Sequence, residues 1–526
     1  MRSYRRTFGQ ENKNSTPSEL TGTKRSDQAE KLWLKPFLKG GSKMEKENRD
    51  YRSDSVLDKL NGSRRIFLKG LIASGVGGVG GALLRPNPGM ASGGTAIQKN
   101  RKSVVEQKKK VPIVEDVDVL VVGGGMAGVG AAVAAGRMGL KTLVVEYFGC
   151  LGGNGTSGMV NNFCGYTTSG PNKVQIVQGI GGEIHKMLFQ RNGVNSMTSY
   201  TFNPEILKMV LDEEMAEANV KLLYYTQVVD SIVEKNVIKG VFIENKGGRQ
   251  AILAKRVLDC SGDGDVCASA SVPFELGDGK GGFLACDMVF HVVNVGPNFN
   301  PSTVNPAATE AMKSGEYKIT RPQAIIQNIM IPGAFWVNWA GVPRTVNGID
   351  PYNLTQASIE GRKVVKELRR FLRDKIAGME NAEVVDTAPK IGLRETRRVM
   401  GGHLLTGEEV LAGTKFKDGI GACAWPIEIV DPVKGRKFVF LKDGDFYTIP
   451  YRCLVPEKVE NLLMAGRFVS CNHEAQASAR VMGPAVVMGQ AIGTAAALSI
   501  KRGVSARDLD VSLLQQELVK AGAFLG

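Results

Sequence analysis

The sequence has 526 residues, of which 43% are hydrophobic and 23% charged, and its formal net charge at pH 7 is +15. This length and composition predict two globular domains and exclude a largely disordered protein. Residues 1–110 hold 24 of the 67 Lys and Arg residues but 10 of the 52 Asp and Glu residues, so 43 basic and 42 acidic residues remain in 111–526. Because the positive charge is concentrated in the N-terminal segment, we expect no nucleic-acid partner.

The N-terminal segment is predicted to be a disordered leader over about residues 1–100, since it is polar and charged without sustained periodicity up to residue 60. Met44 is an alternative start. Ser63–Lys69 reads Ser-Arg-Arg-Ile-Phe-Leu-Lys and precedes the glycine-rich apolar stretch Gly70–Leu84. This pattern resembles a bacterial twin-arginine export signal. The apolar stretch has fifteen residues, which is short of the roughly 20 that span a membrane.

The leader therefore predicts the twin-arginine export machinery as a partner and a periplasmic or otherwise exported location. Met90-Ala91-Ser92 offers small residues but no clean Ala-x-Ala cleavage site. The signal could be removed, or it could remain as a membrane anchor. An intracellular protein with a chance match to the signal is the remaining alternative.

After the leader, Val117–Val122 is nearly all apolar and β-branched, which predicts a buried strand of a parallel sheet. It leads into Gly123–Gly128, which fits the pattern G-x-G-x-x-G. An Ala-rich helix is expected over 129–138, followed by a second strand over 141–145 and the acidic residue Glu146. This order of strand, glycine turn, helix, strand and acid predicts a Rossmann-type dinucleotide site.

Each position of the glycine turn has a physical reason. Gly123 permits the tight turn, Gly125 lets the backbone approach a pyrophosphate, and Gly128 allows the helix to pack closely. The amides at Met126 and Ala127 begin the helix and face the phosphates with the positive end of its dipole. We expect all five residues to bind or shape a cofactor site.

The glycine turn alone cannot distinguish FAD from NAD. Glu146 stands where a carboxylate accepts hydrogen bonds from the adenosine ribose in either case. The flexible loop Leu151–Gly158 follows at once and offers hydroxyl and amide donors that a NAD domain would hardly need. Val257–Asp265 and Asn461–Arg467 are two further strand-to-turn segments, and the second precedes a helix of small residues over Ala485–Ile500. These pieces favour FAD.

Together the motifs resemble the FAD-dependent oxidoreductases of the glutathione-reductase and fumarate-reductase structural class, and more narrowly the bacterial family called FAD-dependent oxidoreductase. The likeness covers about residues 115–522. Besides the segments above, it is carried by Ile391–Arg398, Tyr451–Leu454, His473-Glu474-Ala475 and Arg480-Val481-Met482.

The resemblance implies that Val228 flanks the adenine and that Gly466 and Arg467 lie by the ribityl chain and pyrophosphate. It also implies that the C-terminal helix points its N-terminus, near Gly483, at the flavin. A proline is expected in the family where this chain has Gly483, so the turn there differs. The full set of expected cofactor-binding residues is Gly123, Gly125, Met126, Ala127, Gly128, Glu146, Gly152, Gly153, Asn154, Thr156, Val228, Gly262, Asp265, Gly466, Arg467 and Gly483.

Candidate catalytic residues are His473, Arg394, Arg397 and Arg480. His473 lies in a family motif just after a cofactor strand, which makes it a candidate general acid or base. The alternative is a histidine of the core or one that orients the cofactor. The three arginines could clamp a substrate carboxylate, because guanidinium offers a planar fork of donors. Alternatively, they form ion pairs or bind FAD phosphate. No metal site is predicted.

The expected fold class is α/β, with a discontinuous Rossmann-type FAD-binding domain over 115–275 and 441–515 and an inserted α+β substrate domain over 276–440. A strand is expected at Phe290–Val295 and a long amphipathic helix at Asn353–Phe371.

The chain shows no second glycine fingerprint after a strand, and its cysteines form no Cys-x-x-Cys pair. We therefore expect an exported dehydrogenase or reductase that transfers hydride between a small organic substrate and FAD and exchanges electrons with a separate carrier. An FAD-binding electron-transfer subunit without its own organic substrate is the alternative.

Overall fold

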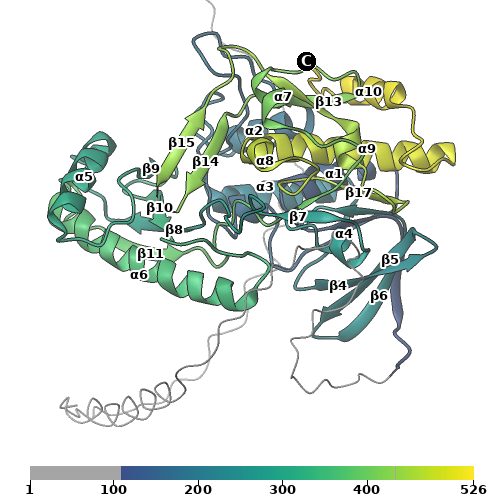
Figure 1. Cartoon of the computed structure of the whole chain (residues 1–526), viewed down its shortest axis with the longest axis horizontal. Helices are drawn as coiled ribbons and strands as arrows, with labels where there is room; N and C mark the ends of the chain where they lie inside the picture. Colours follow the sequence, from purple (N-terminus) through teal and green to yellow (C-terminus); the bar gives the residue numbers. More distant parts are fainter. Residues whose placement is uncertain (1–107, 433) are drawn as a thin grey trace, which may run out of the picture. The chain divides into compact units, whose positions relative to one another are not determined.

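A computed structural model describes residues 108–432 and 434–526, which belong to one compact unit (Figure 1). The predicted disordered leader and the twin-arginine motif lie outside the described residues.

A seven-stranded sheet forms the base of this unit. In spatial order its strands are β3 (Lys221–Leu223), β2 (Thr142–Val145), β1 (Ile113–Val122), β6 (Gly248–Asp259), β5 (Val237–Asn245) and β4 (Gln227–Glu234), with β17 (Leu462–Met464) paired to the end of β6. The strands β1, β2, β3, β6 and β17 run parallel, whereas β4 and β5 form an antiparallel extension. The carboxyl ends of β1, β6 and β17 therefore meet at one edge, where parallel α/β sheets bind ligands.

The helices α1 (Met126–Arg137) and α9 (Met482–Arg502) cross at very short range. A Cβ atom on Gly489 would stand 2.0 Å from the Ala127 carbonyl oxygen, and one on Gly493 would stand 2.1 Å from that of Ala131. Small residues therefore bring α9 directly behind the glycine turn. Within the described part of the chain, α9 is the one helix long and apolar enough to cross a membrane, and 94% of its apolar window is buried in the fold, as expected of a core helix.

A second core surrounds a four-stranded antiparallel sheet, in the order β11 (Glu383–Thr387), β8 (Asp287–Val293), β10 (Phe335–Gly341) and β9 (Ile325–Asn328). The helix α6 (Pro351–Lys375) lies along this sheet, near α5 (Val304–Ser314) (Figure 1). It is longer than the predicted Asn353–Phe371, because Asp350 caps its first amides and Pro351 fits the first turn.

The other elements complete the two cores and their connections. They are α2 (Gly179–Gln190), α3 (Pro204–Glu217), α4 (Asp265–Ser269), α7 (Gly407–Leu411), α8 (His473–Ala479), α10 (Val511–Lys520), β7 (Phe274–Leu276), β12 (Arg397–Val399), β13 (Gly419–Cys423), β14 (Ile427–Asp431), β15 (Gly435–Val439) and β16 (Tyr447–Pro450), with short 3-10 turns at Gly153–Gly155, Pro301–Thr303 and Tyr451–Leu454.

The predicted α/β class with a parallel Rossmann-type sheet is confirmed. The limits predicted for the inserted domain, 276–440, stay a prediction. The second hydrophobic core draws on buried residues from Cys286 to Leu393 and on Met159, and Val399 already belongs to the first core. The chain thus returns to the first core well before residue 440, and the hairpin β14–β15 follows that return.

Candidate functional site

A cavity of about 980 Å³ opens at the carboxyl ends of β1, β6 and β17. All the expected cofactor-binding residues line it except Gly128, Thr156 and Gly483; those that do are Gly123, Gly125, Met126, Ala127, Glu146, Gly152, Gly153, Asn154, Val228, Gly262, Asp265, Gly466 and Arg467. Segments far apart in the chain thus surround one space of the size of a cofactor site.

The glycine turn shows why its three key positions lack side chains. Gly123 has a φ of +98°, and a Cβ there would stand 2.5 Å from the Cys260 carbonyl oxygen. A Cβ on Gly128 would stand 1.9 Å from the Gly123 carbonyl oxygen, so this residue serves helix packing and does not face the cavity. Around a Cβ on Gly125 nothing lies within 4 Å, although Gly125 lines the cavity. Its missing side chain therefore leaves room for a ligand.

Backbone contacts fasten the loop after Glu146 to the glycine turn. The Gly152 amide donates to the Gly124 carbonyl at 2.8 Å. The Glu146 carboxylate accepts hydrogen bonds from the Gly124 amide at 2.6 Å and the Phe148 amide at 2.8 Å. The Thr156 hydroxyl donates to the Leu151 carbonyl at 2.5 Å. Thr156 is buried and does not line the cavity, so it stabilises the loop and does not face the cofactor space as expected.

Charged groups surround the part of the larger cavity near α4. Arg467 pairs with Asp263, and Arg397 pairs with Asp265 at 2.8 Å. Burial alone would raise the pKa of Asp263, but Arg467, Lys390 and a hydrogen bond from Thr396 lower it. Burial, together with the neighbouring Asp263 and Asp259 carboxylates, raises the pKa of Asp265 to about 6.

Lys390 is a cavity residue that the sequence did not reveal. It lines the larger cavity, and burial, reinforced by the charge of Arg467, lowers its pKa. A half-buried cation in the lining of a pyrophosphate site would offset phosphate charge. Its position one residue before the Ile391–Arg398 motif was the only available signal.

A second, smaller cavity of about 280 Å³ adjoins the first. The two share Asn154, Arg480 and Met482 in their linings. The remaining lining of the smaller cavity comes from β8, β9 and β10, the hairpin β14–β15, and the segment around Arg394. The loop at Val160, Asn162 and Cys164 also contributes, as do Trp425 and Val481. The start of α9 therefore separates a cofactor-sized space from a space for a small molecule.

Two of the candidate arginines belong to the smaller cavity. Arg394 pairs with the buried Asp287 and also donates to the Ala285 carbonyl at 2.6 Å. Arg480 pairs with the buried Glu428 at 2.7 Å. Arg397, in contrast, lines the larger cavity only. It pairs there with Asp265, as the alternative of an ion-pair role predicts.

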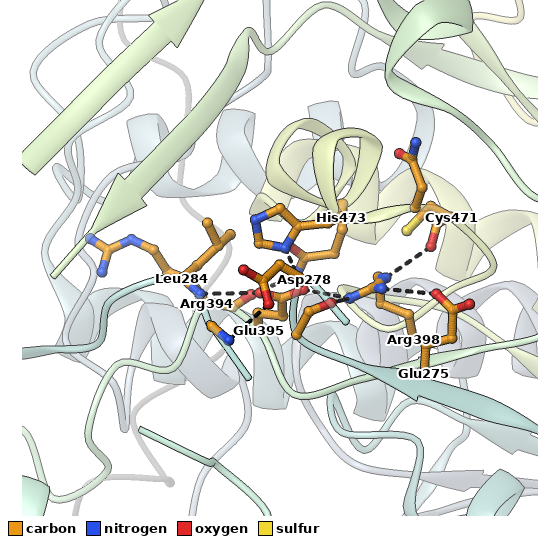
Figure 2. A network of polar contacts seen from close by, with 12 residues as sticks. Glu275, Asp278, Leu284, Arg394, Glu395, Arg398, Cys471 and His473 are labelled. Carbon is orange, nitrogen blue, oxygen red and sulfur yellow. Dashed lines mark hydrogen bonds and ion pairs between the residues drawn. The ribbon is translucent and has the colours of Figure 1, made fainter. Parts of the chain in front are cut away.

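His473 begins α8 and lines neither cavity. Its Nδ1 lies 2.9 Å from Glu395 Oε1, and Arg398 donates to the same oxygen at 2.6 Å. Burial opposes protonation, but the hydrogen bond and charge of Glu395 raise the pKa of His473. Figure 2 shows these three side chains as one network from which the side chain of Arg394 points away. The catalytic role of His473 stays a prediction, and its contact with the buried Glu395 is compatible with the alternative of a core histidine.

Gly483 also lies outside both linings. The helix α9 begins at Met482, and the Gly483 amide donates to the Cys164 carbonyl at 3.0 Å. A Cβ on Gly483 would stand 2.7 Å from the Gly165 carbonyl oxygen. Glycine is needed here for close backbone approach, and the residues of α9 that reach the larger cavity are Met482 and Ala485.

Solved structures that match this chain are remote from it in sequence. A geranylgeranyl bacteriochlorophyll reductase-like protein from Thermoplasma acidophilum is 14% identical, with a TM-score of 0.38 over 77% of this chain and 83% of that one. An L-proline dehydrogenase from P. horikoshii is 13% identical, with a TM-score of 0.36 over 78% and 99%. The p-nitrophenol 4-monooxygenase PnpA from Pseudomonas putida DLL-E4 is 12% identical, with a TM-score of 0.39 over 77% and 84%.

A parallel sheet, a glycine turn, a helix N-terminus and the acidic residue Glu146 after β2 surround one large cavity. These features define a dinucleotide-binding protein of the Rossmann type. The family model described as FAD dependent oxidoreductase matches residues 118–518, so the chain belongs to this family. It is an FAD-dependent oxidoreductase with FAD as its cofactor. The cavity fits this cofactor, since it leaves open space at Gly125 and has three cationic side chains, Lys390, Arg397 and Arg467, in its lining.

Proposed function

We propose that this protein transfers hydride between FAD and a small organic substrate held in the smaller cavity. The observation that carries the proposal is the junction of the two cavities at Asn154, Arg480 and Met482. When bound, FAD supplies the hydride acceptor or donor at its ring system. An electron-transfer subunit without its own substrate would not require a separate cavity beside the cofactor site.

The side chains around the smaller cavity would position the substrate and exclude water. Trp336 and Trp425 form apolar parts of its wall, and Arg480 stands at the border with the cofactor space. Burial, with the nearby Glu428 carboxylate, raises the pKa of the Cys164 thiol to about 12. Cys164 is therefore a neutral thiol at physiological pH, which argues against a thiolate relay beside the flavin.

The proposal extends to export and to an electron partner. The Ser-Arg-Arg-Ile-Phe-Leu-Lys motif at Ser63–Lys69 supports export by the twin-arginine machinery to the periplasm, with the signal either removed or kept as an anchor. The twin-arginine route moves folded proteins, which suits a chain that takes up its cofactor in the cytoplasm. The sequence has no second glycine fingerprint after a strand for a nicotinamide cofactor, which supports a separate electron carrier.

Anaerobic mixing of the purified holoprotein with organic compounds tests the hydride transfer. Hydroxy acids and amines should be tried on the oxidised protein and enoates on the reduced protein, with flavin absorbance as the readout. At least one compound should change the flavin redox state without a partner protein. If only a partner protein reduces the flavin, the alternative of an electron-transfer subunit is correct.

A cavity-filling variant locates the reaction. Val289 lines the smaller cavity, so Val289→Phe should keep FAD and lose the response to the compound. Val385, on β11, is 59% exposed and lines neither cavity, and Val385→Phe is the matched control that should keep both properties. A response that survives in Val289→Phe would place the substrate elsewhere.

Export is tested by fusing residues 44–95 to a reporter that is active only outside the cytoplasm. Changing Arg64 and Arg65 together to Lys should stop reporter activity, because the twin-arginine pair is the feature the machinery reads. Unchanged reporter activity in the paired variant would favour a chance match to the signal.

A further inference from the structure

The wall of the smaller cavity holds more buried positive charge than negative charge. Arg394, Arg436 and Arg480 line it together with two carboxylates, Asp287 and Glu428. Arg321, outside the lining, also pairs with Asp287, so Arg321 and Arg394 lie at Asp287, and Arg436 and Arg480 lie at Glu428. All six side chains are at most 10% exposed. Each carboxylate therefore has two cationic partners, and the cluster keeps two positive charges in excess.

The protonation states support this count. Although burial opposes ionisation, the adjacent arginines hold the pKa values of Asp287 and Glu428 below their usual ranges, so both are ionised. Burial lowers the pKa of Arg436 to about 10, which still leaves it charged at neutral pH. The excess charge is thus present under physiological conditions.

A buried charge without a partner costs several kcal/mol, so a cluster of this kind is stable when an anion completes it. The phosphates of FAD are not that anion for the whole cluster, because Arg394 and Arg436 line only the smaller cavity. Arg480 pairs with Glu428 through one terminal nitrogen, and its Nε is buried without a hydrogen-bond partner. The geometry leaves guanidinium donors for an incoming acid group.

Two uncharged side chains add a second requirement. Trp336 and Asn338 are alternate residues of β10, so they lie on the same face of the sheet, and both line the cavity. Among the described residues, Trp336 Nε1 and Asn338 Oδ1 are buried and have no hydrogen-bond partner. The indole needs an acceptor and the amide oxygen needs a donor, and a hydroxyl group can provide both.

The rest of the wall is largely apolar. Leu393, Trp425, Phe438 and Met482 contribute to it. A volume of about 280 Å³ suits a small carbon skeleton. The ligand therefore combines an acid group, a hydroxyl group and a short apolar body.

We propose that the smaller cavity binds a small hydroxycarboxylate, with its acid group at Arg436 and Arg480 and its hydroxyl group between Trp336 and Asn338. This inference rests on the proposed function, since it names the substrate class of the same site. It is a statement about binding, so it can be tested without turnover.

The binding test uses oxidised holoprotein with 2-hydroxybutanoate, its amide and butanoate as probes. Thermal stabilisation and perturbation of the flavin spectrum report binding. We expect the hydroxy acid to bind at least about tenfold more tightly than either analogue, because each analogue lacks one charge-assisted or hydroxyl contact. Equal binding of acid and amide would overturn the proposal, as would equal stabilisation by inorganic phosphate.

Two variants separate binding from structure. Arg436→Met should raise the Tm of the ligand-free holoprotein by a few degrees, because Glu428 keeps Arg480 as its partner, and it should abolish stabilisation by the hydroxy acid. Arg369→Met removes a half-exposed arginine that pairs with Glu383 and lies outside both cavities, and it serves as the matched control that keeps hydroxy-acid binding. A lowered Tm with intact binding in Arg436→Met would contradict the proposal.

Trp336→Phe keeps the aromatic ring and removes the indole N–H, so it should narrow the preference for 2-hydroxybutanoate over butanoate. An unchanged preference would refute the hydroxyl contact even if Arg436→Met fails to fold.

The outcomes of these experiments also distinguish the binding proposal from the proposed hydride transfer. Tight acid binding with no flavin reduction by any organic compound leaves the binding site standing and removes the proposed hydride transfer. Reduction of the flavin by neutral compounds, with no preference for acids in binding, leaves the proposed hydride transfer standing and removes the hydroxycarboxylate site.

Discussion

Replacement of Gly125 by Val isolates the contact between the glycine turn and the cofactor. Gly125 is the N-cap of α1 with a φ of −67°, which any residue adopts, and its Cβ would meet nothing within 4 Å. The loss of a good N-cap residue costs about 0.5–2 kcal/mol. Val places three methyl-sized groups in the space that a pyrophosphate needs, so FAD should be excluded. At a thousandfold excess of FAD over its Kd, that loss removes about 4 kcal/mol of ligand-linked stability.

The assay compares FAD released per protein and the free energy of unfolding with and without added FAD. The free energy of unfolding of the Gly125→Val protein should lie within about 2 kcal/mol of that of wild-type apoprotein and should gain nothing from FAD. Gly182→Ala in α2 is the matched control, because its Cβ has room and Gly182 lies outside both cavities. Stoichiometric FAD in the Val variant would refute the placement of the cofactor against α1.

Three further changes probe the charged groups. Glu146→Ala should reduce FAD retention. It should also lower the free energy of unfolding by about 1–3 kcal/mol, because two backbone amides lose their acceptor. Unchanged flavin content would exclude a cofactor role for Glu146. Lys390→Met should weaken FAD binding about tenfold or more in equilibrium titrations, and equal affinity would remove Lys390 from the phosphate site. The raised pKa of His473 means that its protonated form stabilises the fold, so the loss of stability in His473→Gln should be largest below about pH 6.5 and shrink as pH rises through the folded pKa. Urea unfolding across pH checks this, and a loss that grows with pH would contradict it.

The cofactor site was predictable because its signals are local. The turn at Gly123–Gly128 requires glycine for reasons of backbone geometry, and the period of the flanking strand and helix can be read within about thirty residues. Val228, Gly466 and Gly483 were expected from the resemblance, and the first two line the larger cavity. Gly483 does not line it, because contact with the Cys164 carbonyl, far away in sequence, decides its role.

The smaller cavity was only partly predictable. Arg394 and Arg480 were identified as candidates, but their partners Asp287 and Glu428 were not. These pairs span 107 and 52 residues, so they exist only after the hairpin β14–β15 and the strand β8 come together. Arg436 carries no sequence signal at all, since a lone arginine in a hairpin is ordinarily a solvated residue.

A crystal structure of the FAD-loaded protein would test the central claim most directly. The pyrophosphate should lie against Gly125 and the start of α1, the adenine near Val228, and the flavin ring at the junction of the two cavities beside Arg480 and Met482. A flavin ring beside Val228, with the adenine at the junction, would contradict the account, because the smaller cavity would then have no redox group next to it.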